Sequence, residues 1–214
     1  MKDICPPATN RKLTVASYVG VLLSAFLLSG CASVFYAKTP TGTFTGKLDV
    51  EWIAPNRFIY RPHSTDPLRF VTSDGRTIQP RAMYTDGGSI PRFFWSLPNY
   101  SPWDFAPGFI IHDWLFEQQH CKEGDWQSFT FERSATILAE AIKTQMVNST
   151  DQDAQTAWVI YQGVKSPIAE KRWASGECKL PPAVSLPPAV SAGEPIPAGT
   201  PMRILTIDAG AARR

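Results

Sequence analysis

Two short segments of the chain carry the residue types that acid–base chemistry uses. Residues 85–91 have the sequence Thr-Asp-Gly-Gly-Ser-Ile-Pro, and His112 is followed directly by Asp113. A histidine that is held by a carboxylate at one ring nitrogen becomes a better proton acceptor at the other. Asp86 is the carboxylate that we expect beside His112, because neighbours on a helix such as His112 and Asp113 point about 100° apart.

Three interpretations of these residues are open. In the first, Asp86 and Ser89 hydrogen-bond the backbone of their own loop, and His112 ties that loop to a helix. In the second, Asp86, His112 and Asp113 form a hydrolytic base or a site whose oxygen ligands suit calcium or magnesium. In the third, Ser89 is a nucleophile in a triad with His112 and Asp86, although no strand-elbow glycine pattern surrounds it.

Neither a zinc site nor a cofactor is expected. The chain has three histidines, and His112 and His120 do not have the i, i+4 spacing that places two imidazoles on one helix face.

Residues 1–30 have the pattern of a secretion signal. Arg11 and Lys12 precede an apolar run that extends from Leu13 to Leu28. The run is shorter than the roughly 20 residues that a straight membrane-spanning helix needs, which leaves a retained span as the weaker alternative.

The end of this leader resembles the cleavage junction of bacterial lipoproteins. Its sequence is Leu28-Ser29-Gly30-Cys31. The resemblance implies cleavage before Cys31 and acylation of the cysteine sulfur and amino group, with chains such as palmitate that anchor a protein stably when two or more are present. Ala32 after the cysteine implies export to the outer membrane, with the domain on the periplasmic side.

Charge argues against nucleic acid as a partner. The chain of 214 residues has a net charge of +2, and cleavage before Cys31 removes three basic residues and one acidic residue. The mature chain is therefore close to neutral and has no basic field to attract nucleic acid. Its length fits one domain of ordinary size.

Cys121 and Cys178 are the cysteines that remain once the leader is removed and Cys31 is acylated. In an oxidising compartment we expect them to form a disulfide, which would stabilise the fold by about 4 kcal/mol in the chain-entropy model. Two free thiols are the alternative.

Alternation of apolar and charged residues predicts a small antiparallel sheet in the first half of the domain. The pattern is clearest from Phe44 to Trp52 and continues at Phe58–Arg61 and Leu68–Thr72. Asp74-Gly75, within residues 73–76, is a strong hairpin signal.

About three helices follow the sheet, which predicts an α+β fold. Pro107 precedes a short helix over residues 109–116, and an apolar stripe predicts a second over residues 131–146. Thr150 with Asp153 resembles a capping pair that begins a third helix, and a short helical piece runs from Pro167 to Gly176.

The predicted domain, residues 44–178, lies between two segments without a core. Residues 31–43 are expected to be a short tether, and residues 179–214 a Pro-rich tail that is mostly disordered. The tail repeats Leu-Pro-Pro-Ala-Val-Ser and could reach an envelope protein partner. Residues 202–207 could instead form one late strand that docks on the sheet.

The two chemical motifs, taken together and in order, resemble the bacterial and phage family known as domain of unknown function 1353. Its pattern is Thr-Asp-x-Ala-Ser-Ile-Pro, then an apolar helix with His-Asp-Tyr-Leu-Tyr, then two further helices. The resemblance covers residues 44–173. This chain differs from the pattern at Gly88, where the family has Ala, at Phe116, where it has Tyr, and at Thr136, where an Asp is expected.

Two functions are consistent with these features. The first is a membrane-anchored envelope lipoprotein with a non-catalytic structural or interaction role. The alternative is a hydrolase of envelope material, phage- or prophage-associated like many of the proteins it resembles, that uses Asp86 with His112 and Asp113. The family itself has no assigned reaction, so the resemblance implies a fold and candidate residues only.

Overall fold

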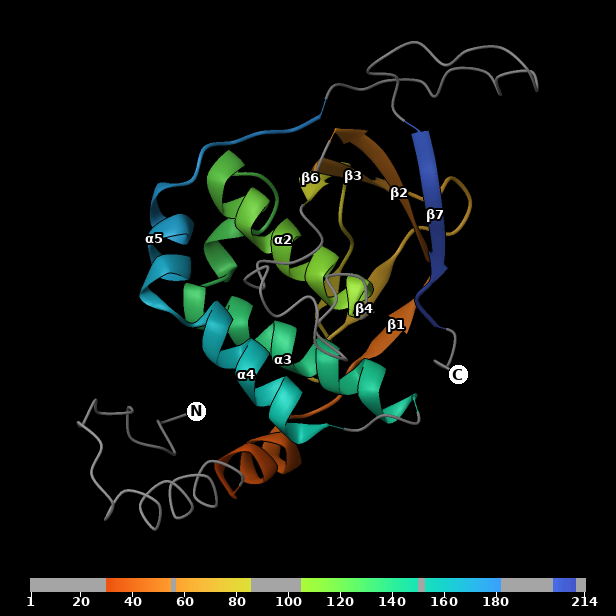
Figure 1. Ribbon diagram of the computed structural model, residues 1–214. Helices are drawn as coiled ribbons and strands as arrows, with labels where there is room; N and C mark the ends of the chain where they lie inside the picture. The colour runs from red at the N-terminus through yellow and green to blue at the C-terminus, as the bar shows by residue number, and fades with distance from the viewer. Residues whose placement is uncertain (1–29, 55–56, 86–104, 150–152, 182–201, 211–214) are drawn as a thin grey trace, which may run out of the picture.

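The computed structural model describes residues 30–54, 57–85, 105–149, 153–181 and 202–210. Over these ranges, two antiparallel sheets lie on one side of the molecule and the helices lie on the other (Figure 1). The predicted α+β class is therefore confirmed.

The larger sheet has the strand order β6-β3-β2-β7, and the smaller sheet has the order β1-β4-β5. The strands are β1 Thr43–Thr45, β2 Lys47–Ala54, β3 Arg57–Pro62, β4 Arg69–Val71, β5 Thr77–Ile78, β6 Met83–Thr85 and β7 Met202–Asp208.

The prediction of one continuous strand from Phe44 to Trp52 is wrong. The chain divides into β1 and β2 at Gly46, and the two strands belong to different sheets. Gly46 has φ +83°, and a Cβ at this position would lie 2.2 Å from the carbonyl oxygen of Pro67. Only glycine fits this turn, because it tolerates positive φ and has no side chain to clash.

The hairpin predicted at residues 73–76 is confirmed. It joins β4 to β5, and Gly75 has φ +83° as such turns require. The turn is fastened to a helix far away in sequence, because the buried carboxylate of Glu140 accepts a hydrogen bond from the backbone N–H of Ser73. Arg133 also pairs with Asp74 at 2.6 Å.

The helices follow the predicted order, with differences at their ends. They are α2 Ala106–Cys121, α3 Phe131–Val147, α4 Ala154–Val164 and α5 Pro167–Ser175, with a short 3₁₀ helix, η2, at Trp126–Ser128. Helix α2 extends five residues past the predicted end at Phe116. The N-cap of α4 is Asp153, whose side chain accepts from Gln155 N, whereas the predicted capping residue Thr150 lies outside the described residues.

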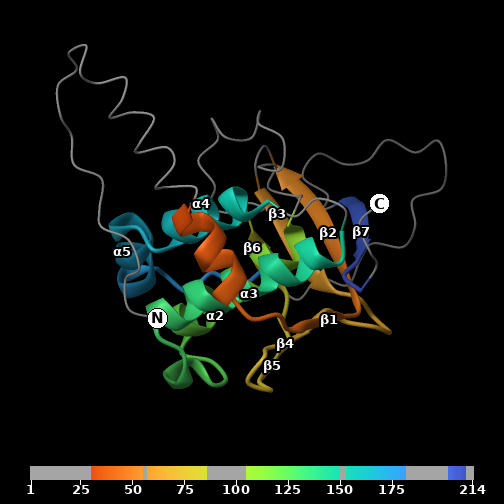
Figure 2. The ribbon, with the colours of Figure 1, turned by 90° about the horizontal axis from the view of Figure 1, so that it is seen from below.

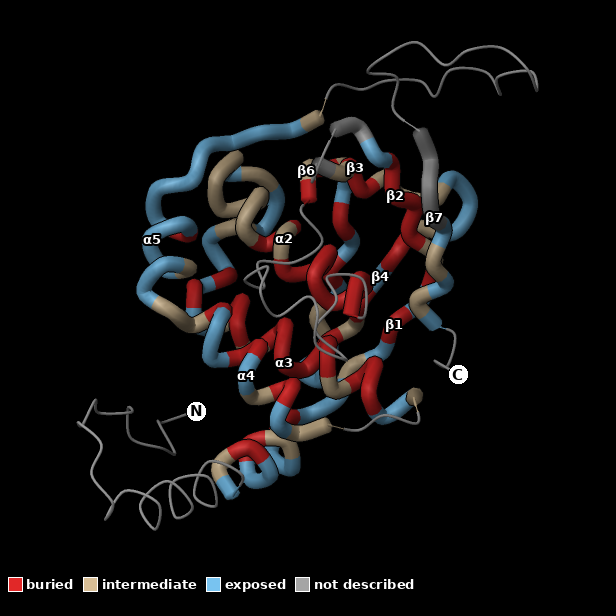
Figure 3. Tube along the Cα trace, in the orientation of Figure 1, coloured by how far each residue is buried: buried red, intermediate tan, exposed pale blue. Residues whose placement is uncertain are grey.

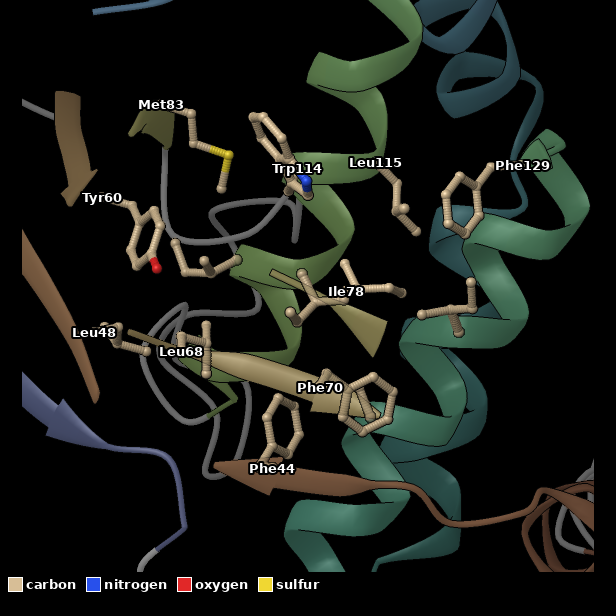
Figure 4. Packing of buried hydrophobic residues seen from close by; sticks show 14 of the residues in the cluster. Phe44, Leu48, Tyr60, Leu68, Phe70, Ile78, Met83, Trp114, Leu115 and Phe129 are labelled. Carbon is tan, nitrogen blue, oxygen red and sulfur yellow. The ribbon is translucent and has the colours of Figure 1, made fainter. Parts of the chain in front are cut away.

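Two hydrophobic clusters form the core, and both α2 and α3 contribute to each of them. The first cluster lies between the sheets and the helices, where Trp114 of α2 lies beside Met83 of β6 (Figure 4). The second contains Phe109 of α2, residues of α3 such as Leu138, and the buried face of α4. Figure 3 shows the resulting run of buried residues along α2 and α3.

The expected tether at residues 31–43 is not a free linker. Residues 30–38 form a helix, which we call the anchor helix, and it lies across α4 and α3 (Figure 2). Ala32 is 1% exposed and Phe35 4%. This docking was not predictable from local sequence, because the contacts of Phe35 are made with α4, more than a hundred residues away.

Part of the expected tail also has regular structure. Residues 202–208 form a strand on the sheet, which was the less favoured of the two expectations. Strand β7 pairs antiparallel with β2, and the hydroxyl of Thr206 donates to a carboxylate oxygen of the buried Asp49 at 2.6 Å. The Pro-rich residues 182–201 lie outside the described residues.

We predict that Glu140→Ala lowers the free energy of unfolding by about 2 kcal/mol, because the Ser73 N–H loses a charged acceptor. Chemical denaturation measures the loss. Glu140→Gln keeps an oxygen acceptor at the same place and should cost less. Equal stability of Glu140→Ala and the wild type would show that the hairpin does not depend on this contact.

Candidate functional site

Helix α2 positions the histidine and the carboxylate of the second motif. It begins at Ala106 with proline in its first turn, where a missing backbone N–H costs nothing. His112, Phe116 and His120 follow one another at i, i+4 spacing and form a row along the helix. Asp113 and Glu117 form a second row beside it.

His112 is a buried residue. Its side chain is 4% exposed, and its Nε2 atom is buried without a hydrogen-bond partner among the described residues. Its ring lies 4.9 Å from that of Phe116, measured between centroids. Burial lowers the pKa of His112 to about 4, so the imidazole is neutral near pH 7 and is a weak proton acceptor.

Asp113 joins the two sequence motifs. Its Oδ2 atom accepts a hydrogen bond from the hydroxyl of Thr85 at 2.8 Å. Thr85 is both the last residue of β6 and the first residue of the loop motif. The start of the loop is therefore attached to α2 one residue away from His112.

The other two predicted site residues, Asp86 and Ser89, lie outside the described residues. The contact that we expected between Asp86 and His112 therefore stays a prediction. Among the predicted site residues, the structure brings His112 and Asp113 to the same pocket.

The pocket has a volume of about 470 Å³. The exposed side of α2 forms one wall, and Phe58 of β3 with Tyr84 and Thr85 of β6 forms another. The end of α4, the start of α5 and the segment after α5 close the remaining side. Charged residues at this side include Arg172, Glu177 and Lys179.

A disulfide holds the segment after α5 against the end of α2. Cys121 and Cys178 are bonded, with their Cα atoms 4.6 Å apart, which confirms the predicted pair. Next to the bond, His120 Nε2 donates to the carbonyl oxygen of Arg172 at 2.9 Å. Gly176 leaves no space for a side chain, because a Cβ there would lie 2.0 Å from the His120 ring.

Burial also shifts two other titratable groups of the pocket wall. It raises the pKa of Glu117, while the backbone N–H and the charge of Lys179 act in the opposite direction. It lowers the pKa of His120, which the hydrogen bond to Arg172 partly offsets. Both net shifts are in the direction that favours the neutral form of the group.

Sequence reasoning missed Glu117 and His120 as pocket residues. A signal was present, because Asp113, Glu117 and His120 have the spacing i, i+4, i+7, which places polar side chains on one face of an otherwise apolar helix. Arg172 and Lys179 carried no such signal, since the disulfide and the path of α5 bring them to the pocket.

Two further properties concern only the described residues. No group of three or more His, Cys, Asp or Glu side chains there is arranged to hold a metal ion. None of the helices in these ranges combines the length and the apolar character needed to cross a membrane.

The buried histidine predicts how stability depends on pH. The unfolded chain takes up a proton at His112 below about pH 6.5, whereas the folded chain excludes it down to about pH 4. Acidification from pH 7 to 4.5 should therefore cost about 2–3 kcal/mol through this residue. His112→Gln should lose less stability over the same range in urea denaturation series. Parallel pH profiles for the two proteins would contradict this assignment.

Comparison with known proteins gives one match. No curated protein and no solved structure matches the chain. Residues 64–164 match the model of a family described as protein of unknown function (DUF1353). The match begins in the loop after β3 and ends at the last residue of α4, so it contains both chemical motifs and supports the domain part of the resemblance.

Proposed function

We propose that this chain is an exported protein, anchored to the outer membrane through lipid on Cys31, whose domain has a non-catalytic interaction role in the envelope. The disulfide between Cys121 and Cys178 carries the first part of this proposal, because such bonds persist in oxidising compartments such as the periplasm. The junction that ends at Cys31 supplies the site of the anchor.

The state of Cys31 provides the test of the anchor. In the structure of the whole chain its sulfur is disulfide-bonded, and a thioether to lipid excludes that bond. Mass spectrometry of protein from the membrane fraction should find a chain that begins at Cys31 and carries acyl chains. The Cys31→Ser variant should no longer be found in the membrane fraction. Unacylated protein that keeps residues 1–30 in the soluble fraction would refute the anchor.

The described polar groups of the pocket favour a non-catalytic role. His112 is buried and weakly basic, Asp113 accepts from Thr85, and His120 donates to the backbone of α5. The contacts of Asp113 and His120 each tie one structural element to another, as polar groups that lose water on folding generally do.

An envelope protein partner is proposed for the Pro-rich tail, since such sequences favour the extended geometry that recognition domains bind. Its test must keep β7, which is part of the sheet. We predict that replacing residues 180–191 with a Gly-Ser segment of equal length abolishes copurification of the partner and leaves thermal stability unchanged. Copurification of the same partner with the replaced segment would argue against the tail as its binding site.

The second candidate function is a hydrolase of envelope material, with Asp86, His112 and Asp113 as its site. One observation favours it, because the pocket reaches both His112 and Asp113, and clefts with converging polar groups are the usual place of active sites.

Asp113→Asn separates the two functions. In a non-catalytic domain, the loss of a charged acceptor for Thr85 costs about 1–3 kcal/mol, and any cellular phenotype follows the amount of folded protein. A folded Asp113→Asn protein that no longer cleaves envelope lipid or peptidoglycan, where the wild type does, would establish the hydrolase instead. Thr85→Val removes the same hydrogen bond without touching the carboxylate and is the matched control.

A further inference from the structure

The anchor helix is fixed to the body of the domain by aromatic packing. The Phe35 ring stacks on Tyr161 with centroids 4.6 Å apart, and it meets the edge of Trp158 at 5.1 Å. Both partners belong to α4. Because Phe35 is 4% exposed, separating the helix from α4 would expose a large apolar surface to water.

The end of the anchor helix is fixed as well. Lys143 of α3 donates through its Nζ atom to the carbonyl oxygens of Tyr36, at 2.7 Å, and of Thr39, at 2.6 Å. Carbonyls in the last turn of a helix have no partner within the helix, and a cation placed there also interacts favourably with the helix dipole. The helix is therefore held along its side and at its C-terminal end.

This pair of helices contributes few charges of its own, although Asp153 and Lys165 lie at the two ends of α4. Helix α4 contains no Asp, Glu, Lys, Arg or His, and Lys38 is the single charged residue of the anchor helix. Val34 on the anchor helix and Val159 on α4 are 41% and 38% exposed. Their neighbours on the exposed sides of the two helices are small or uncharged, such as Ser33, Ala37, Gln155 and Gln162.

We infer that the anchor helix and α4 form the face with which the domain lies on the phospholipid bilayer. This inference rests on the proposed acylation of Cys31, which lies in the first turn of the anchor helix. A chain that begins at Cys31 has no spacer between its lipid and its folded body. The anchor thus draws this face toward the lipid, and the absence of acidic residues from the two helices, apart from the capping Asp153 of α4, suits contact with anionic headgroups.

The surface of the two helices fits the interface region of a bilayer better than a site of deep insertion. Partly exposed valines can enter the boundary between headgroups and acyl chains, and the polar neighbours stay hydrated there. The basic Lys38 at the end of the anchor helix complements anionic lipid. The domain consequently has a fixed orientation on the membrane, in contrast to a domain on a flexible tether.

The test uses the acylated protein, purified from membranes and placed in vesicles of phosphatidylethanolamine and phosphatidylglycerol that contain a spin-labelled lipid. A fluorophore is introduced through p-azidophenylalanine in place of Val159. The control fluorophore replaces Glu177, whose side chain is 79% exposed. Glu177 belongs to the segment after α5, which runs on the side of the molecule away from the anchor helix (Figure 1). We expect the spin-labelled lipid to quench the label at position 159 roughly twofold or more and the control label little.

Two surface variants test the role of the face. Val34→Glu adds a negative charge to the exposed side of the anchor helix and should reduce the quenching of the label at position 159. Ile168→Glu changes a residue of α5 that is 76% exposed and should leave it unchanged. Phe35→Ala releases the anchor helix and should lower the quenching while the acyl chains remain on Cys31, with circular dichroism to verify the fold.

Equal, weak quenching at both positions in acylated protein would overturn the proposed membrane face while leaving the lipid anchor intact. Protection of the label at position 159 from an aqueous quencher, without quenching by the spin-labelled lipid, would assign the face to a protein and would overturn the inference too. Failure of the proposed function itself is recognised separately, because mass spectrometry would then find no acyl chain on Cys31.

Discussion

The burial of α2 on most of its circumference is the constraint on which the rest of the structure depends. Ile111 and Trp114 pack toward the sheets, whereas Phe109 belongs to the cluster shared with α3 and α4. Helix α3 divides its side chains between the same two clusters. A helix that is apolar on several sides must be covered on several sides. The sheets therefore cover one side of the pair α2 and α3, and α4 covers another, which makes one folded unit.

The same burial determines the chemistry that α2 can offer. His112 lies between the core-facing side of the helix and the side that lines the pocket. It therefore loses solvent without gaining a partner for Nε2 within the described part of the chain. Asp113, one residue further, remains partly accessible and contacts Thr85. The polar row that continues to His120 forms a pocket wall that the disulfide from Cys121 closes. Packing and pocket therefore use opposite sides of one helix.

Local signals predicted those features that neighbouring residues determine. The turn at Asp74-Gly75 follows from glycine conformation, and α3 follows from its apolar period. Features that depend on distant contacts were not predictable in this way. The alternation through Gly46 continues without interruption, and only the nearby carbonyl of Pro67 shows why the strand must divide. The segment around Phe35 is ordered because Phe35 packs on Tyr161 of α4. Strand β7 finds its backbone hydrogen-bond partners in β2, near the other end of the sequence.

Because α2 and α3 contribute side chains to both hydrophobic clusters, the domain should unfold as one cooperative unit. Native-state hydrogen exchange measures this most directly, because it gives an opening free energy for each backbone amide. We predict that the amides of Ile111 in α2, Leu138 in α3 and Tyr60 in β3 exchange with the same opening free energy, equal to that of global unfolding. Exchange of Leu138 through a much less costly opening, while Tyr60 remains protected, would contradict it.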